Sequence, residues 1–339
     1  MKKYNVAVLG ATGMVGQEIL KILDQRNFPI ESIKMTASSR SAGIKMQFQN
    51  KEYTVEAATP QAFVGIDIVL SSAGASVSRE LAPSIVEQGA IIIDNTSAFR
   101  MQDDVPLVIA EVNAHALKNH KGIIANPNCS TMQLLMALKP LHDYSPIKRV
   151  LVSTYQAVSG AGIKAINELM EQSKSIIDGT YQKSEKTVLP QVIGFNVIPH
   201  GGNFLENGYT EEEIKMTNET RKILEVPDLA VAATCVRVPV VTGHSESVNV
   251  EFYKPLSPEK ARELMSAFAG VVVIDDPATH SYPMPNQSAG KDEVFVGRVR
   301  KDLSNDNALN MWIVSDNIRK GAALNAVQIA EKMIEMGLI

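Results

Sequence analysis

The sequence predicts an α/β protein with two domains. The first is a Rossmann-like, doubly wound parallel sheet, and the second is an α+β domain with a mixed, largely antiparallel sheet. Short apolar runs alternate with helical periodicity over roughly the first 125 residues, and longer β-rich runs at closer spacing follow. The full length of 339 residues is enough for each domain to bury a core of its own.

The N-terminal half alternates strand and helix. "YNVAVLG" (Tyr4 to Gly10) is a nearly continuous apolar run, which is typical of a buried parallel strand. After a glycine-rich turn, apolar residues recur at helical spacing at Val15, Ile19, Ile22 and Leu23. A helix is also expected over 77–88, and further strands over 32–38, 67–74 and 89–97.

The second half has a different pattern. β-rich runs lie at 149–160, 229–243 and 247–253, and their spacing favours a mixed or antiparallel sheet. The polar region 171–209 is expected to be loops. An amphipathic helix is predicted near the C-terminus from the apolar positions Ile318, Ala322, Ala326, Ile329, Ala330 and Met333.

Composition excludes several classes of protein. The net charge of −4 gives no reason to expect nucleic acid or an anionic membrane as a partner, and no apolar run is long enough to span a bilayer. The two cysteines make neither a disulfide framework nor a zinc spacing, so we expect no metal. A reducing cytoplasm is the expected location.

A dinucleotide site is predicted at "GATGMVG", where Gly10, Gly13 and Gly16 recur between a strand and a helix. This spacing gives a tight turn and lets helix-start N–H groups face a pyrophosphate. The alternative is an ordinary tight turn. The second strand then runs into "SSRSAG", which lacks the acidic residue that holds the ribose of NAD. Arg40, with Ser38 and Ser41, suits a 2′-phosphate instead, so we predict a preference for NADP(H); a solvated loop arginine is the alternative.

Cys129 in "NPNCST" is predicted at or just before the N-terminus of a helix, because Pro127 ends the preceding element and helical spacing follows. Unpaired N–H groups and the helix dipole stabilise a thiolate there. The alternative is a buried structural thiol, a role that fits Cys235 inside its apolar strand. His244, in a Gly-His-Ser turn between two strands, is a candidate base, while His200 and His280 stay undecided.

The motifs together resemble aspartate-β-semialdehyde dehydrogenase in its bacterial form. The resemblance covers nearly the whole chain and rests on "GATGMVG", "DNTSAFR", "PNCST", "STYQAVSGAG", "ATCVRVPV", "GHSESV" and "FVGRVRKDL…WIVSDNIRKGAA". It implies an NADPH-dependent phosphorylating aldehyde dehydrogenase that reduces L-aspartyl-4-phosphate to L-aspartate-4-semialdehyde and releases phosphate. It also implies a place in lysine, diaminopimelate, methionine, threonine and isoleucine biosynthesis, and a homodimer or a dimer of dimers.

The resemblance also implies site residues. Cys129 matches the nucleophile, His244 the acid/base, and Gln156 the residue that orients the thioester and substrate. Arg237 matches the carboxylate ligand and Glu212 the amine contact, while Arg100, Lys215 and Asn128 match phosphate contacts. On residue types alone, Glu212 and Lys215 would be a solvated ion pair. The implied cofactor contacts are Thr12, Gly13, Met14, Val15, Arg40, Ser41, Ser159, Gly160 and Asn317, to which the residue pattern adds Gly10 and Ser38.

In the implied reaction, the Cys129 thiolate forms a thioester, NADPH reduces it, and the His244 imidazolium protonates the developing oxygen. The implied NADP-binding domain comprises 1–128 with the C-terminal helix 318–339, and 129–317 is the catalytic and dimerisation domain. Three alternatives stay open: a related acyl-phosphate reductase acting on N-acetylglutamyl phosphate or glyceraldehyde 3-phosphate, a non-catalytic NADPH-binding sensor, and a Cys-His hydrolase.

Overall fold

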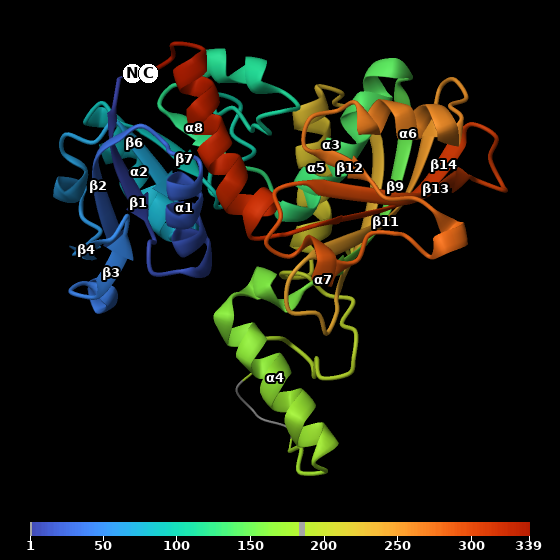
Figure 1. The fold of residues 1–339 in the computed structure, drawn as a ribbon, viewed down its shortest axis with the longest axis horizontal. Coiled ribbons are helices and arrows are strands. Elements are labelled where there is room, and N and C mark those ends of the chain that lie inside the picture. The colour runs from blue at the N-terminus through green and yellow to red at the C-terminus, as the bar shows by residue number, and fades with distance from the viewer. Residues whose placement is uncertain (1, 183–186) are drawn as a thin grey trace. The chain divides into compact units, whose positions relative to one another are not determined.

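A computed structural model describes residues 2–182 and 187–339 of the chain. It divides into two compact units (Figure 1): unit 1 is Met1–Asn128 with Ala322–Ile339, and unit 2 is Cys129–Gly321. Residues 183–186, part of the segment expected to be loops, lie outside the described residues.

Unit 1 is built on a six-stranded parallel sheet in the order β5-β2-β1-β6-β7-β8. The order reverses direction beside β1, which confirms the predicted doubly wound topology. The strands are β1 (Tyr4–Leu9), β2 (Ile30–Ala37), β5 (Glu56–Ala57), β6 (Ile68–Ser71), β7 (Ile91–Asp94) and β8 (Ile123–Ala125). Unit 1 also contains the helices α1 (Met14–Gln25) and α2 (Ala75–Glu87). A separate hairpin is formed by β3 (Lys45–Phe48) and β4 (Lys51–Thr54). Short 3-10 turns lie at Ser39–Ser41, Pro60–Phe63 and Ala114–Asn119.

The C-terminal helix belongs to the core of unit 1. Apolar residues of β1, α1 and α8 (Asn325–Glu335), among them Val8, Ile22 and Ile329, are fully buried in one cluster. Burial of one such side chain stabilises the fold by about 1.5–3 kcal/mol. The predicted C-terminal helix is divided in the structure, because Arg319–Leu324 form a π-helical segment before α8 begins.

Unit 2 contains a second six-stranded sheet in the order β10-β9-β11-β14-β13-β12. The pairs β10–β9 and β12–β13 are parallel and the others are antiparallel, which confirms the predicted mixed sheet. The strands are β9 (Ile147–Gln156), β10 (Ala230–Arg237), β11 (His244–Phe252), β12 (Val271–Val273), β13 (Val294–Lys301) and β14 (Ala308–Ser315).

Three helices lie side by side on one face of this sheet: α3 (Cys129–Tyr144), α5 (Glu211–Leu224) and α6 (Pro258–Ser266). On the other face, the rings of Tyr155 and Trp312 lie 5.2 Å apart. Shorter elements are the 3-10 segments Val158–Ala161 and Pro277–Thr279 and the helix α7 (Pro285–Ser288).

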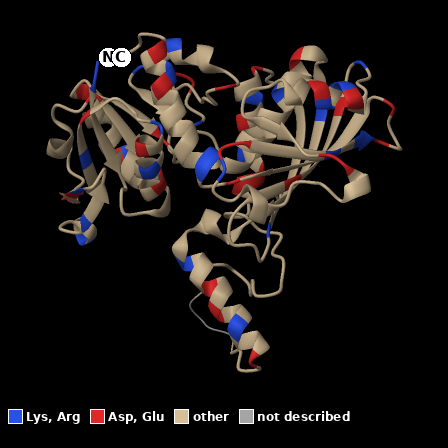
Figure 2. Ribbon diagram, in the orientation of Figure 1, with Lys and Arg blue, Asp and Glu red and all other residues tan. Residues whose placement is uncertain are grey.

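The region expected to be loops over 171–209 begins later than predicted, because α4 (Ile163–Ile177) extends into it. Ala165 and Leu169 of α4 pack against Leu189, Ile193 and Ile198, so the following segment supplies an apolar surface that the polar composition hid. Figure 2 shows basic and acidic residues mixed along the ribbon of α4, which is typical of a solvated helix face.

Candidate active site

The glycine-rich turn of unit 1 lies at the carboxyl end of β1. Gly10 has φ 87°, in the left-handed region that favours glycine, and its N–H donates to the carbonyl of Thr36 at 2.8 Å. A β-carbon on Gly16 would lie 2.2 Å from the Gly10 carbonyl oxygen, so only glycine lets α1 pack this closely. Among the residues that the structure describes, no side chain caps the start of α1 at Gly13, so the first N–H groups of this helix face the turn.

The predicted 2′-phosphate residues follow the neighbouring strand. β1 and β2 are paired in parallel from Tyr4 to Leu9, so the segments after both strands lie at the same sheet edge. The 3-10 turn Ser39–Ser41 places Arg40 there as an exposed side chain. An exposed guanidinium near a glycine-rich turn is positioned to meet a phosphate.

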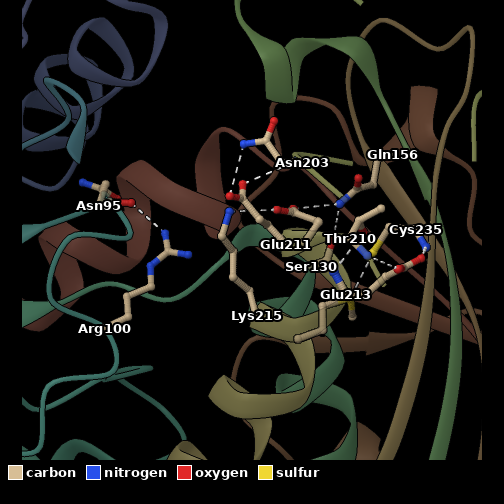
Figure 3. Close-up of polar contacts among 12 residues, drawn as sticks. Asn95, Arg100, Ser130, Gln156, Asn203, Thr210, Glu211, Glu213, Lys215 and Cys235 are labelled. Carbon is tan, nitrogen blue, oxygen red and sulfur yellow. Dashed lines mark hydrogen bonds and ion pairs between the residues drawn. The ribbon is translucent and has the colours of Figure 1, made fainter. Parts of the chain in front are cut away.

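Arg100 of unit 1 is buried, and its Nη2 donates to the carbonyl oxygen of Asn95 at 2.8 Å (Figure 3). Asn126 Nδ2 donates to Asn95 Oδ1 at 2.8 Å, and Asn325 Nδ2 donates to Asn126 Oδ1 at 2.6 Å. These hydrogen bonds connect Arg100 and the residues just before buried Asn128 to Asn325, the first residue of the C-terminal helix α8. Asn126 and Asn325 were not predicted, because Asn126 carried no role in the "NPNCST" stretch and Asn325 lies in no motif.

In unit 2, Cys129 is the first residue of α3, as predicted. Its surroundings are close-packed, since a β-carbon on Gly321 would lie 2.8 Å from its Cβ. Burial lowers the pKa of Arg237, whereas the negative charge of the Cys129 thiolate raises the pKa of the same guanidinium by a smaller amount. The guanidinium and thiolate are therefore close enough for each to favour the charged form of the other.

His244 begins β11 rather than lying in the turn that precedes it, and its side chain is 1% exposed. The N–H of Ala157 donates to its Nδ1 at 3.0 Å, so the neutral ring carries its proton on Nε2. Burial, and then the charge of Arg237, place the pKa of His244 well below its usual value. The resting ring is consequently neutral. The imidazolium that the resemblance implies for the proton-transfer step has to form during turnover.

Gln156 lies between the first turn of α3 and helix α5. Its Nε2 donates to Ser130 Oγ at 2.8 Å and to Glu212 Oε1 at 3.2 Å (Figure 3). Lys215 Nζ lies 3.5 Å from Glu212 Oε2, which is the i,i+3 ion pair expected from residue types alone. The contact with buried Gln156 distinguishes Glu212 from a member of a purely solvated pair.

Arg237 ends β10 as Gln156 ends β9, and the two residues are partners in this parallel pair. Arg237 Nη1 donates to the carbonyl oxygen of Ala157 at 2.7 Å. The carboxyl ends of two parallel strands thus bring a guanidinium and an amide together on the side of unit 2 that holds Cys129 and His244.

Asn317 fixes the segment that contains Ser159 and Gly160. Its Oδ1 accepts from the Gly243 N–H at 2.9 Å, and its Nδ2 donates to Ser159 Oγ at 2.9 Å. Gly243, at φ 95°, directly precedes His244, so Asn317 also orients the start of β11.

Cys235 is fully buried in β10, and burial raises the pKa of its thiol, which fits the structural role predicted for it. Among residues 2–182 and 187–339, no cluster of three histidine, cysteine or acidic side chains could hold a metal ion. In the same residues, no helix has the length and apolar content needed to cross a bilayer.

Two family models match the chain. Residues 5–120 match "Semialdehyde dehydrogenase, NAD binding domain", and residues 138–320 match "Semialdehyde dehydrogenase, dimerisation domain". The chain is 54% identical over 340 residues to aspartate-semialdehyde dehydrogenase of Aquifex aeolicus, and 50% identical over 343 residues to that of Bacillus subtilis, with 99% of each chain covered.

Solved structures are also similar. Aspartate semialdehyde dehydrogenase II of Vibrio cholerae, complexed with ASA, has a TM-score of 0.95 at 43% identity, with 99% of both chains covered. The Candida albicans enzyme with NADP has a TM-score of 0.78 at 26% identity, with 100% of both chains covered.

Proposed function

Because the chain belongs to the aspartate-semialdehyde dehydrogenase family, we propose that it reduces L-aspartyl-4-phosphate with NADPH and releases L-aspartate-4-semialdehyde and phosphate. The observation that carries this proposal is the group in unit 2: a thiol at the start of α3, with a guanidinium, a buried imidazole and a carboxylate-bound amide around it. The NADP named for the Candida albicans structure and the exposed Arg40 support NADP(H) as the cofactor.

We propose the following steps. The Cys129 thiolate attacks the acyl carbon, and phosphate leaves with the electron pair of the broken C–O bond. When bound, NADPH supplies a hydride for the carbonyl carbon of the resulting thioester. The developing oxygen faces Nε2 of His244, which donates a proton and takes it back when the hemithioacetal collapses and expels the thiolate.

His244 is neutral at rest, so its acid role requires a second proton. The negative α-carboxylate proposed to bind Arg237 stays on the acyl-enzyme after phosphate has left. It offsets the positive charge of Arg237 and so raises the pKa of the His244 ring. The hydrogen bond from the Ala157 amide to Nδ1 has to break as that proton arrives.

Substrate roles follow residue by residue. We propose that Arg237 binds the α-carboxylate, Glu212 the ammonium group, and Arg100, Lys215 and Asn128 the phosphate. Gln156 orients the acyl group, because its amide is held from two sides. Gly10, Thr12, Gly13, Met14, Val15, Ser38, Arg40, Ser41, Ser159, Gly160 and Asn317 are proposed as the NADP contacts.

Phosphate-dependent reduction of NADP with aspartate semialdehyde tests this function. N-acetylglutamate semialdehyde and glyceraldehyde 3-phosphate are the matched alternatives, since neither carries a free α-amino group for Glu212. A preference for either of them would contradict the proposal. If the protein binds NADPH tightly but oxidises none of the three aldehydes, the alternative of a non-catalytic NADPH-binding sensor would be favoured.

We also propose a cytoplasmic homodimer that acts in the aspartate-derived amino-acid pathways. The dimerisation description of the second family model and the partly exposed Tyr155 and Trp312 on the open face of the sheet support the assembly. Sedimentation of the wild type and Trp312→Glu tests it, and a wild-type monomer would contradict it.

A further inference from the structure

Glu246 of β11 is a fully buried carboxyl group that the proposed reaction does not use. Its side chain is 0% exposed, and within the described residues neither of its oxygens has a hydrogen bond of ordinary geometry. The Nε2 of Gln133, on α3, likewise has no partner there. Burying such groups costs stability, so their presence in a native core calls for a functional reason.

The placement of this pair repeats that of the proposed catalytic pair. Gln133 lies four residues after Cys129 on the same face of α3, a rise of about 6 Å. Glu246 lies two residues after His244 on the same face of β11, a rise of about 6.6 Å. Gln133 and Glu246 thus form a second layer between the two elements that bear Cys129 and His244.

This second layer is anchored to a third element. Gln133 Oε1 accepts from Ser315 Oγ at 2.6 Å, and Ser315 is the partner of His244 in the β11–β14 pair. The Gln133 amide lies close enough to Glu246 to influence its titration, although their contact falls outside ordinary hydrogen-bond geometry.

Burial raises the pKa of Glu246 well above its usual value, so the group is a neutral acid that can both donate and accept. Among the titratable groups on the neighbouring elements, Cys235 on β10 is near enough for the charge of Glu246 to raise the pKa of its thiol. The others are Cys129, Lys139, His142, Asp143 and Tyr144 on α3, Lys148, Arg149 and Tyr155 on β9, Arg237 on β10, and His244 and Glu251 on β11. Across β9 and β14 it faces Thr154 and Ile313, which carry no charge.

We propose that Glu246 is a positioning residue: together with Gln133 it braces α3 against β11 and sets the separation of Cys129 and His244. The inference rests on the proposed function, in which these two residues carry the chemistry.

The test is the pH profile of Cys129 alkylation by iodoacetamide, measured in a Cys235→Ala background. Glu246→Leu is expected to shift this profile by about 0.5 pH unit or more, because the thiolate depends on its separation from charged and polar neighbours. It should also lower kcat by about 10-fold or more with little change in KM. Glu246→Gln, which stays neutral and keeps the polar contact, should restore the wild-type profile.

Variants at Gln133 and Val250 serve as controls. They distinguish a specific effect of the Gln133–Glu246 pair from a general destabilisation of β11. Gln133→Leu should cause the same shift as Glu246→Leu, and the double variant no more than either. Val250→Ala, a fully buried position further along β11, should leave the profile in place. A wild-type profile in Glu246→Leu, or an equal shift in Val250→Ala, would overturn the proposal. Alkylation requires no substrate, so it reports on Cys129 even if the enzyme does not reduce aspartyl phosphate. If Glu246→Leu shifts the alkylation profile but the wild type shows no turnover, only the proposed function is contradicted.

Discussion

Gly160 and His244 lie so close together that a β-carbon on residue 160 would be 3.2 Å from Nε2 of His244. The same β-carbon would lie 3.0 Å from Nη1 of Arg237. Residue 160 therefore limits the space in front of the two side chains to which acid/base and substrate-binding roles are proposed.

Gly160→Ala is expected to lower kcat/KM by about 10-fold or more, because the methyl group must displace the imidazole or the guanidinium. Steady-state kinetics measure this effect. Ala161→Ser, at the exposed neighbouring position, is the matched control and should stay within about twofold of wild type. Equal rates for Gly160→Ala and the control would show that the space is not needed.

Cys129→Ala should abolish reduction of the acyl phosphate, because no thioester can form without the sulfur. Binding of NADPH, followed by fluorescence titration, should be retained. A variant that kept a substantial fraction of the wild-type rate would refute the covalent route.

Arg40→Ala should reduce the NADPH:NADH ratio of kcat/KM by about 10-fold or more, since a guanidinium–phosphate pair is a strong charge-assisted contact. The wild type and variant are compared with both cofactors. An unchanged ratio would mean that Arg40 faces solvent and does not contact the 2′-phosphate.

Glu246→Gln should stabilise the fold increasingly as the pH rises. The folded pKa of Glu246 is raised above 4.5, so both states are protonated below that value and the carboxyl causes no pH-dependent loss there. Above it, the unfolded chain ionises first, folding must take up a proton, and wild-type stability falls by up to about 1.4 kcal/mol per pH unit. The glutamine lacks this cost.

Urea denaturation of both proteins at intervals of about one pH unit between pH 5 and 8 measures the difference. The stability gap should widen toward alkaline pH. A constant gap would mean that Glu246 is ionised in the folded protein.

The sequence predicted those features that depend on local pattern. Apolar runs located most strands of both sheets, and the proline before Cys129 located the start of α3. Glycine spacing located the tight turn between β1 and α1, because a left-handed residue and a close helix packing both require glycine.

Features that depend on distant contacts were not predictable. Gln133 and Glu246 are separated by more than a hundred positions, and only the packing of α3 on β11 brings them together. The neutral resting state of His244 likewise depends on burial and on Arg237. The extent of α4 was missed because its apolar partners lie in a segment of mostly polar composition.

The central claim is that Cys129 carries the acyl group, and intact-protein mass spectrometry tests it most directly. The enzyme is mixed with aspartyl phosphate without NADPH, quenched in acid and weighed, with Cys129→Ala as the control. We expect an added aspartyl mass that maps to Cys129 and is absent from the variant. An unmodified Cys129 in enzyme that turns over normally when NADPH is supplied would contradict it.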